Sequence, residues 1–382
     1  MAFVLTGAMG VASFPIFALA ALGPAVVAEL EISRTQFGAV STTMFVTAIF
    51  GSLLIGRAVD RIGARRVLVA LFLCSTTAVG LVASAGSFAQ LLTAGIVVGL
   101  AQASANPATN SAVSYHVRRE HRGTLMGVKQ AGVPLSQFIA GAMLAPVAVV
   151  IGWRPAVLLG LALILPTLLA TLIVLPAGAP SSAAGAGPRM GVPRGLGWLF
   201  VCTFLLATAL QAANVYLPLY AFEVVGLSAS TAGVLVGVVG AVGMVARILL
   251  GRIAGASPRP VRIVASIGIV ATASVLSIAA AGGHELLLWL GAIVFGASVF
   301  GVNVVGMTVI IRSVDAASAG RASGALSMVM FTGFALGPIG FGSLVDATGS
   351  YLVAWLIVSS ICALAGAVGL LAWRRVGRRL AA

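Results

Sequence analysis

An arginine interrupts the apolar stretch GMVARILLGR, which covers residues 243–252. Arg252 ends the stretch and can reach water, but Arg247 lies among apolar side chains five residues earlier. A charged side chain inside a membrane span is costly and usually faces a cavity or a partner. Because a planar guanidinium binds a carboxylate through paired hydrogen bonds, Arg247 is a candidate ligand for an anionic substrate. The alternative is that its long side chain reaches the membrane surface.

A second cation, Lys129, is the one lysine of the chain and lies in the stretch GTLMGVKQAGVPLSQ. If a helix begins near Gly123, Lys129 lies about 9 Å inside it. Contact with a cavity and extension to the surface are again the two interpretations. No aspartate or glutamate falls deep within an apolar stretch of this sequence. A cationic substrate would find no carboxylate there, so a small organic anion suits these residues better.

Amide side chains supply further polar groups in the apolar stretches. Gln102, Asn106 and Asn110 follow one another at intervals of four residues, which places them in a stripe on one helix face. Asn303 lies 197 residues after Asn106, at the equivalent position of an internal repeat. Hydrogen bonds between helices, worth about 1 kcal/mol each, are the alternative role for such amides. We expect Asn106 and Asn303 in particular to contact substrate, because they occupy matched positions.

Another apolar stretch carries Gln211 and Asn214 on one helix face, with Tyr216 close by. Together these side chains would form a weakly polar site with a positive bias. The candidate substrate-binding residues are Arg247, Lys129, Asn106, Asn303, Asn214, Gln102 and Tyr216.

The composition of the chain indicates that these residues lie in a membrane protein. The 382 residues are 60% hydrophobic and 8% charged, with a mean hydropathy of +1.15, whereas soluble domains carry about 25% charged residues. A spanning helix needs about 20 mostly apolar residues. The first six candidates are 3–28, 36–56, 67–86, 88–115, 124–150 and 154–175, and the second six are 198–222, 230–251, 261–282, 285–311, 322–345 and 351–373. These long continuous runs favour helices over barrel strands, so we predict an all-α membrane protein with 12 transmembrane helices.

The basic residues predict the orientation of these spans. The net charge is +14, and eighteen arginines fall in one set of alternating loops and ends, whereas only Arg34 and Arg154 fall in the other set. Positively charged loops stay in the cytoplasm, so we expect both termini to be cytoplasmic in a multi-pass protein of the cell (inner or plasma) membrane. This distribution explains the charge as a topology signal, and we expect no nucleic acid as a partner.

The linker PAGAPSSAAGAGPRMGVPRGLG divides the chain into two similar halves. Its composition is typical of a flexible tether. Several residues recur between the halves at a nearly constant offset of 195 to 197 positions, Gly56 and Gly251 among them. We predict an N-terminal six-helix bundle at 1–175, a cytoplasmic linker at 176–197 and a C-terminal six-helix bundle at 198–382.

The sequence lacks the signatures of enzymes and metal sites. It contains no HExxH, GxSxG or Walker motif, and no Cys/His spacing typical of a metal site. The three cysteines fall far apart in apolar stretches, so we expect no disulfide framework. We therefore expect a protein that is not an enzyme and that uses no cofactor.

The loop GRAVDRIGARR, residues 56–66, resembles the cytoplasmic signature of the major facilitator superfamily. The matching positions, to which the resemblance assigns a gating role, are Gly56, Asp60, Arg61, Gly63, Arg65 and Arg66. The resemblance implies two six-helix bundles around a central cavity, and transport by alternating access as a monomer in the lipid bilayer. It also implies that Asp60 accepts hydrogen bonds from the start of the eleventh span, near Gly320 and Arg321, where a helix dipole favours a carboxylate.

The eighth span, with MVARILLG, is similar to that of monocarboxylate porters and oxalate:formate-type exchangers, which implies that Arg247 pairs with a substrate carboxylate. Two features of the superfamily are absent: an arginine in span four, common in proton-coupled members, and the antiporter-type motif of span five. Gly95 stands where a span-four arginine would fall, and Val133 interrupts the antiporter-type motif before Pro134. We therefore expect a porter, such as a symporter, for a monocarboxylate or related small organic anion, with a proton as the candidate coupling ion. The alternative is efflux of apolar compounds such as drugs.

Overall fold

A computed structural model describes residues 1–176, 196–313 and 316–379, and within these ranges the side chains of residues 53, 119, 123–124, 316–321 and 375–379 are not described. Every regular element in these ranges is a helix. Eleven helices are long and apolar enough to cross a membrane, or twelve if the bent pair Arg34–Ser52 and Leu54–Ile62 counts as one span. The predicted all-α membrane fold is confirmed.

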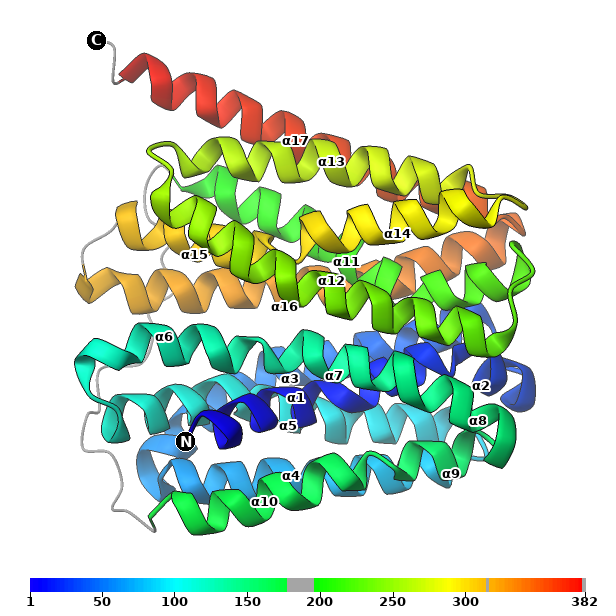
Figure 1. Cartoon of the computed structure of the whole chain (residues 1–382), viewed down its shortest axis with the longest axis horizontal. Helices are drawn as coiled ribbons and strands as arrows, with labels where there is room; N and C mark the ends of the chain where they lie inside the picture. Colours follow the sequence, from blue (N-terminus) through cyan, green and yellow to red (C-terminus); the bar gives the residue numbers. More distant parts are fainter. Residues whose placement is uncertain (177–195, 314–315, 380–382) are drawn as a thin grey trace.

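The helices form two groups that lie one above the other in Figure 1. The first group contains α1 (Ala2–Ala21), α2 (Gly23–Leu30), α3 (Arg34–Ile62), α4 (Ala64–Ala83), α5 (Phe88–His116), α6 (Arg119–Gln130), α7 (Gly132–Ile139), η1 (Ala140–Leu144), α8 (Ala145–Ile151), α9 (Trp153–Leu158) and α10 (Leu161–Val174). The second contains α11 (Gly197–Glu223), α12 (Ala229–Ala256), α13 (Pro260–Ala279), α14 (Glu285–Val299), α15 (Val302–Ser313), α16 (Ala316–Thr348) and α17 (Tyr351–Arg379). Most of the predicted linker lies outside the described residues, so its bounds stay a prediction.

Proline explains two interruptions in the span predicted at 124–150. Pro134 has no N–H, so the carbonyl of Gln130 loses its partner four residues along, and the helix breaks between α6 and α7. Further along, a π-helical turn, η1, leads into α8, which has Pro146 in its first turn. The sequence predicted the extent of this span but not its division.

The interrupted span packs closely against α12. A Cβ at Gly141 of η1 would overlap the backbone of Gly237, and a Cβ at Gly233 would overlap the side chain of Ala145. A Cβ at Gly240 would lie 2.8 Å from the backbone nitrogen of Phe138. Small residues let helix backbones approach in a membrane, so these glycines hold the two bundles together along one seam.

Polar contacts also join the bundles, at the end of the molecule where α3 begins. The backbone N–H groups of Arg34 and Thr35 donate to the carboxylate of Asp346, at the end of α16, over 3.1 and 2.7 Å. The guanidinium of Arg34 lies 2.8 Å from the carboxylate of Glu223 on α11. A carboxylate is favoured at a helix N-terminus. We call this end the latched end and the end with both chain termini the basic end.

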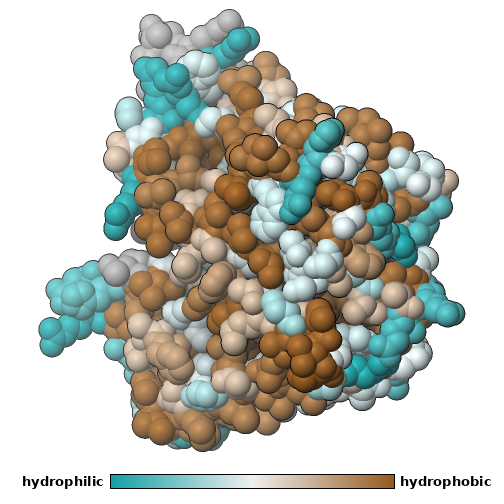
Figure 2. Space-filling view, turned by 45° about the vertical axis from the view of Figure 1, so that its right-hand side comes forward, coloured by the Kyte–Doolittle hydropathy of each residue, from teal (hydrophilic) through white to brown (hydrophobic). Residues whose placement is uncertain are grey.

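The bundles separate at the basic end. A Cβ at Gly127 of α6 or at Gly324 of α16 would meet no atom within 4 Å, unlike those in the seam. The outline of the molecule is correspondingly indented between the bundles in Figure 2. The latch predicted between Asp60 and the start of α16 involves Arg321, whose side chain lies outside the described set.

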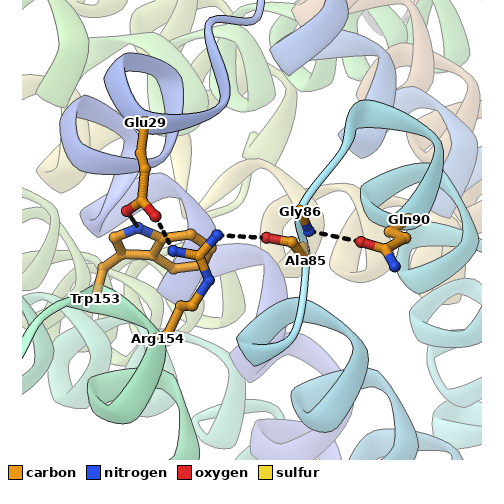
Figure 3. A network of polar contacts seen from close by, with 6 residues as sticks. All are labelled: Glu29, Ala85, Gly86, Gln90, Trp153 and Arg154. Carbon is orange, nitrogen blue, oxygen red and sulfur yellow. Dashed lines mark hydrogen bonds and ion pairs between the residues drawn. The ribbon is translucent and has the colours of Figure 1, made fainter.

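A network within the first bundle stabilises the latched end (Figure 3). The carboxylate of Glu29 on α2 accepts hydrogen bonds from the indole of Trp153 and from the guanidinium of Arg154, both on α9. The guanidinium of Arg154 also donates to the carbonyl of Ala85 over 2.7 Å. Arg154 thus joins α2, α9 and the turn before α5.

Candidate substrate-binding site

Lys129 is buried inside the first bundle, with 1% of its surface exposed. It lies near the end of α6, and its ammonium donates to Thr109 Oγ1 over 2.9 Å and to Asn110 Oδ1. A longer contact of 3.5 Å reaches Asn106 Oδ1. Two of the three residues in the polar stripe predicted on α5, Asn106 and Asn110, therefore face Lys129, and the lysine side chain turns inward instead of extending to the membrane surface.

The ammonium of Lys129 has only neutral partners among the described residues. The four ion pairs found there join Arg34 to Glu223, Arg154 to Glu29, and both Arg118 and His121 to Glu120. Burying a charge without a counter-charge is unfavourable, and hydrogen bonds to oxygen offset only part of the cost. This part of the protein therefore carries a positive potential that an anion would neutralise.

Arg247 is half-buried in the middle of α12 and bridges the two bundles. Its Nη1 donates to the carbonyl of Gln130 over 3.0 Å, which is the carbonyl that Pro134 leaves without a helical partner. Its Nε donates to the carbonyl of Phe300, at the break between α14 and α15, over 3.3 Å, and its guanidinium carbon lies 5.6 Å from the centre of the Phe300 ring. Nη2 of Arg247 has no hydrogen-bond partner in the described part of the chain, so it can bind a ligand.

Gln130 connects the two cations. Its side-chain amide donates to Asn106 Oδ1 over 3.2 Å, and Asn106 also contacts Lys129. Its carbonyl accepts the hydrogen bond from Arg247. Asn106 thus links Lys129 of the first bundle to Gln130, whose carbonyl binds Arg247 of the second bundle, and we call Lys129 and Arg247 the cation pair.

A chain of neutral polar side chains crosses between the bundles. Gln137 Nε2 on α7 donates to Asn214 Oδ1 on α11 over 3.2 Å, and Asn214 Nδ2 lies 3.5 Å from Gln211 Oε1. Gln211 Nε2 donates to Ser41 Oγ on α3 over 3.2 Å. We call these four residues the amide chain. Sequence reasoning missed Gln137, although it lies eight residues after Lys129 on the same predicted span, a spacing that keeps both on one helix face.

Two other predicted residues make contacts away from the cation pair. Gln102 accepts a hydrogen bond from Ser13 of α1 over 3.3 Å, which joins two helices of the first bundle. Tyr216 is fully buried, donates to the carbonyl of Arg34 over 2.5 Å, and stacks on Phe341 with ring centres 4.6 Å apart. Tyr216 therefore lies at the latched end, a placement that suits gating.

Asn303 lies on α15, three residues after Phe300, whose carbonyl binds Arg247. It is partly buried and forms no hydrogen bond with any residue in the described ranges. The structure thus gives Asn106 and Asn303 different surroundings, although they match in the repeat.

The signature residues predicted to gate lie at the basic end, around the turn from α3 to α4. Gly63 adopts a φ of +86° in this turn, a conformation that favours glycine. Arg65 donates from Nη2 to the carbonyl of Leu172 on α10 over 3.0 Å. Arg61 and Arg66 are exposed beside this turn, whereas Gly56 and Asp60, on α3 before it, are partly buried.

Comparison with known proteins places this geometry in a large family. The Major Facilitator Superfamily matches residues 4–338. The hexuronate transporter of Bacillus subtilis (strain 168) is 28% identical over 137 residues, which are 36% of this chain and 32% of that protein, so the chain spans about a third of that relative's length.

Solved structures have the same fold. A bacterial homolog of the human lysosomal transporter Spinster, in an inward-facing and occupied conformation, superposes with a TM-score of 0.76 at 16% identity, covering 98% of this chain and 96% of that one. The nucleoside transporter NupG superposes with a TM-score of 0.74 at 16% identity, covering 97% of this chain and 98% of that one. At such low identity these likenesses show the fold alone.

Proposed function

Because the chain belongs to the Major Facilitator Superfamily and is a membrane transporter of that fold, we propose that it carries a small organic anion across the cytoplasmic membrane by alternating access. The observation that carries the proposal is the burial of Lys129 among Thr109, Asn110 and Asn106 without a carboxylate. A transported anion would supply the missing counter-charge. Transporters built from repeated bundles usually bind their substrate near the membrane midplane, between the bundles, and we expect the same location here.

The cation pair suits a carboxylate. Arg247 donates to two backbone carbonyls, its Nη2 has no partner among the described residues, and a guanidinium is well matched to a planar carboxylate. Lys129 adds a compact charge next to Gln130 in the other bundle. An anion bound to both cations would hold the bundles together, so that binding and the rocking of the bundles would be coupled.

The matched relative agrees with this chemistry, because a hexuronate carries a carboxylate. We include a monocarboxylate as the simplest substrate and a proton as the coupling ion. A carboxylate substrate can carry the proton itself, so this coupling needs no buried acid.

Uptake into proteoliposomes tests the proposal. Purified protein should accumulate a labelled monocarboxylate, faster when an imposed pH step drives protons in the same direction. Arg247→Ala and Lys129→Met should each lower the initial rate at least tenfold. Arg252→Gln is the matched control, because it removes an exposed arginine at the end of the same helix, and its rate should equal that of the wild type.

Equal rates in Arg247→Ala, Lys129→Met and wild type would refute the anion site. Transport of apolar compounds together with failure to move any carboxylate would instead support the alternative, an efflux transporter. If the uptake rate does not depend on the imposed pH step, the proton is not the coupling ion, but the small organic anion remains the proposed substrate.

A further inference from the structure

The amide chain is buried and uncharged. The exposed fractions are 1% for Ser41, 3% for Gln211, 6% for Asn214 and 0% for Gln137. Its hydrogen bonds run from α3 through α11 to α7, so two of them cross from one bundle to the other. Amides of this kind can join helices permanently, but a bond between bundles that move apart cannot be permanent.

Alternating access requires these crossing bonds to break. When the latched end opens, α11 must separate from α3 and α7, which belong to the other bundle. Each separated amide then loses a partner, and an unpaired polar group in an apolar setting is unfavourable. A substrate that enters from the latched end would therefore meet hydrogen-bond donors and acceptors that have just lost their partners.

One group of the amide chain already lacks a partner. Gln137 Oε1 is buried and accepts no hydrogen bond from any described residue, although its own Nε2 is bound to Asn214. Buried polar atoms are nearly always paired, so such an orphan indicates a place for a donor from outside the protein. A substrate hydroxyl is the kind of donor that fits an amide oxygen.

The chemistry of the amide chain favours a substrate with hydroxyl groups. An amide presents both donors and an acceptor, and a hydroxyl likewise donates and accepts, so the two satisfy each other without charge. Lys129 lies near the end of α6 and Gln137 lies on α7, eight residues further along the interrupted span. This separation favours an extended molecule with a carboxylate at one end over a compact one.

We propose that the transported anion is a polyhydroxylated carboxylate, whose carboxylate binds the cation pair and whose hydroxyl groups replace the bonds of the amide chain. This proposal rests on the proposed function and adds the class of substrate. It assigns to Gln137, Asn214 and Gln211 the choice between hydroxylated and plain carboxylates.

Calorimetric binding to the purified protein tests the proposal with three probes: gluconate, hexanoate and sorbitol. Gluconate and hexanoate share a carboxylate and a six-carbon chain but differ in hydroxyl groups, and sorbitol carries hydroxyl groups without the carboxylate. The wild type should bind gluconate at least tenfold more tightly than hexanoate and should bind sorbitol most weakly.

Gln137→Leu should lower the affinity for gluconate about tenfold, which corresponds to the loss of one hydrogen bond of about 1.4 kcal/mol, and should leave the affinity for hexanoate unchanged. Gln90→Leu is the matched control, because Gln90 is exposed in the first turn of α5 and its side chain accepts a hydrogen bond from the N–H of Gly86, away from the amide chain. Asn214→Leu repeats the test should Gln137→Leu not fold.

The outcomes separate the two proposals. Equal affinity for gluconate and hexanoate in the wild type, or an unchanged ratio in both amide variants, would overturn the hydroxyl proposal and leave the anion transporter standing. Binding of neither carboxylate would overturn both. Binding of sorbitol as tight as that of gluconate would overturn the carboxylate and with it the proposed function.

Discussion

The buried ammonium of Lys129 is held by hydrogen bonds alone among the described residues. This determines how replacing Lys129 is expected to change the stability of the protein. Its ammonium is buried beside Thr109, Asn110 and Asn106, and no described acid neutralises it. Replacing a buried charge by an apolar side chain of similar size is often neutral or stabilising. The residue is therefore expected to serve binding at the expense of stability.

Lys129→Met tests that expectation. We expect the unfolding temperature without ligand to stay equal to that of the wild type or to rise by a few degrees, and added carboxylate to give no further stabilisation. Thermal unfolding in detergent, with and without carboxylate, measures both effects. A large fall in the ligand-free unfolding temperature, with carboxylate stabilisation intact, would show that Lys129 is a structural residue.

The polar contacts of the helices around Lys129 and Arg247 could be predicted only in part from the sequence. The polar stripe on α5 followed from four-residue spacing, and the structure places Asn106 and Asn110 beside Lys129. The use of the Gln130 carbonyl by Arg247 could not be predicted, because it joins two helices 117 residues apart in sequence. Spacing within one helix reports its faces, but contacts between bundles depend on how the bundles pack.

The close packing of η1 against α12 also gives a prediction about these helices. Gly141→Val should lower the transport rate at least tenfold without unfolding the protein, because the added side chain would overlap the backbone of Gly237 and keep the latched end from closing. Gly282→Val is the control, since a Cβ at Gly282 would meet no atom within 4 Å. A Gly141→Val protein that transports at the wild-type rate would show that the seam can relax.

For the whole molecule, the polar contacts of Asp346 indicate how the closed end is held. Asp346→Asn keeps one acceptor for Arg34 and Thr35 but loses the charge that favours the N-terminus of α3. We expect the latched end to open more often. A Val40→Cys reporter, buried in the closed state, should then react several-fold faster with a maleimide, in a background without the native cysteines. An unchanged labelling rate would mean that the seam alone keeps this end closed.

The sequence predicted the fold of the whole molecule better than it predicted the contacts of individual side chains. The all-α membrane fold followed from hydropathy and the superfamily from the signature around Asp60; the family match confirms the superfamily, and the described residues contain eleven candidate spans, or twelve with the bent pair. The repeat matched Asn303 to Asn106, yet only Asn106 reaches a cation in the structure. Internal symmetry predicts equivalent backbones, whereas function depends on side chains that the two halves do not share.

A double-mutant cycle on carboxylate uptake tests the central claim most directly. The initial rate would be measured in proteoliposomes with wild type, Lys129→Met, Arg247→Ala and the variant with both changes. If both cations bind one carboxylate, each single variant should lose most of the rate and the double variant should be little worse than either, since groups acting on one ligand are not additive. Wild-type uptake in the double variant would contradict the account.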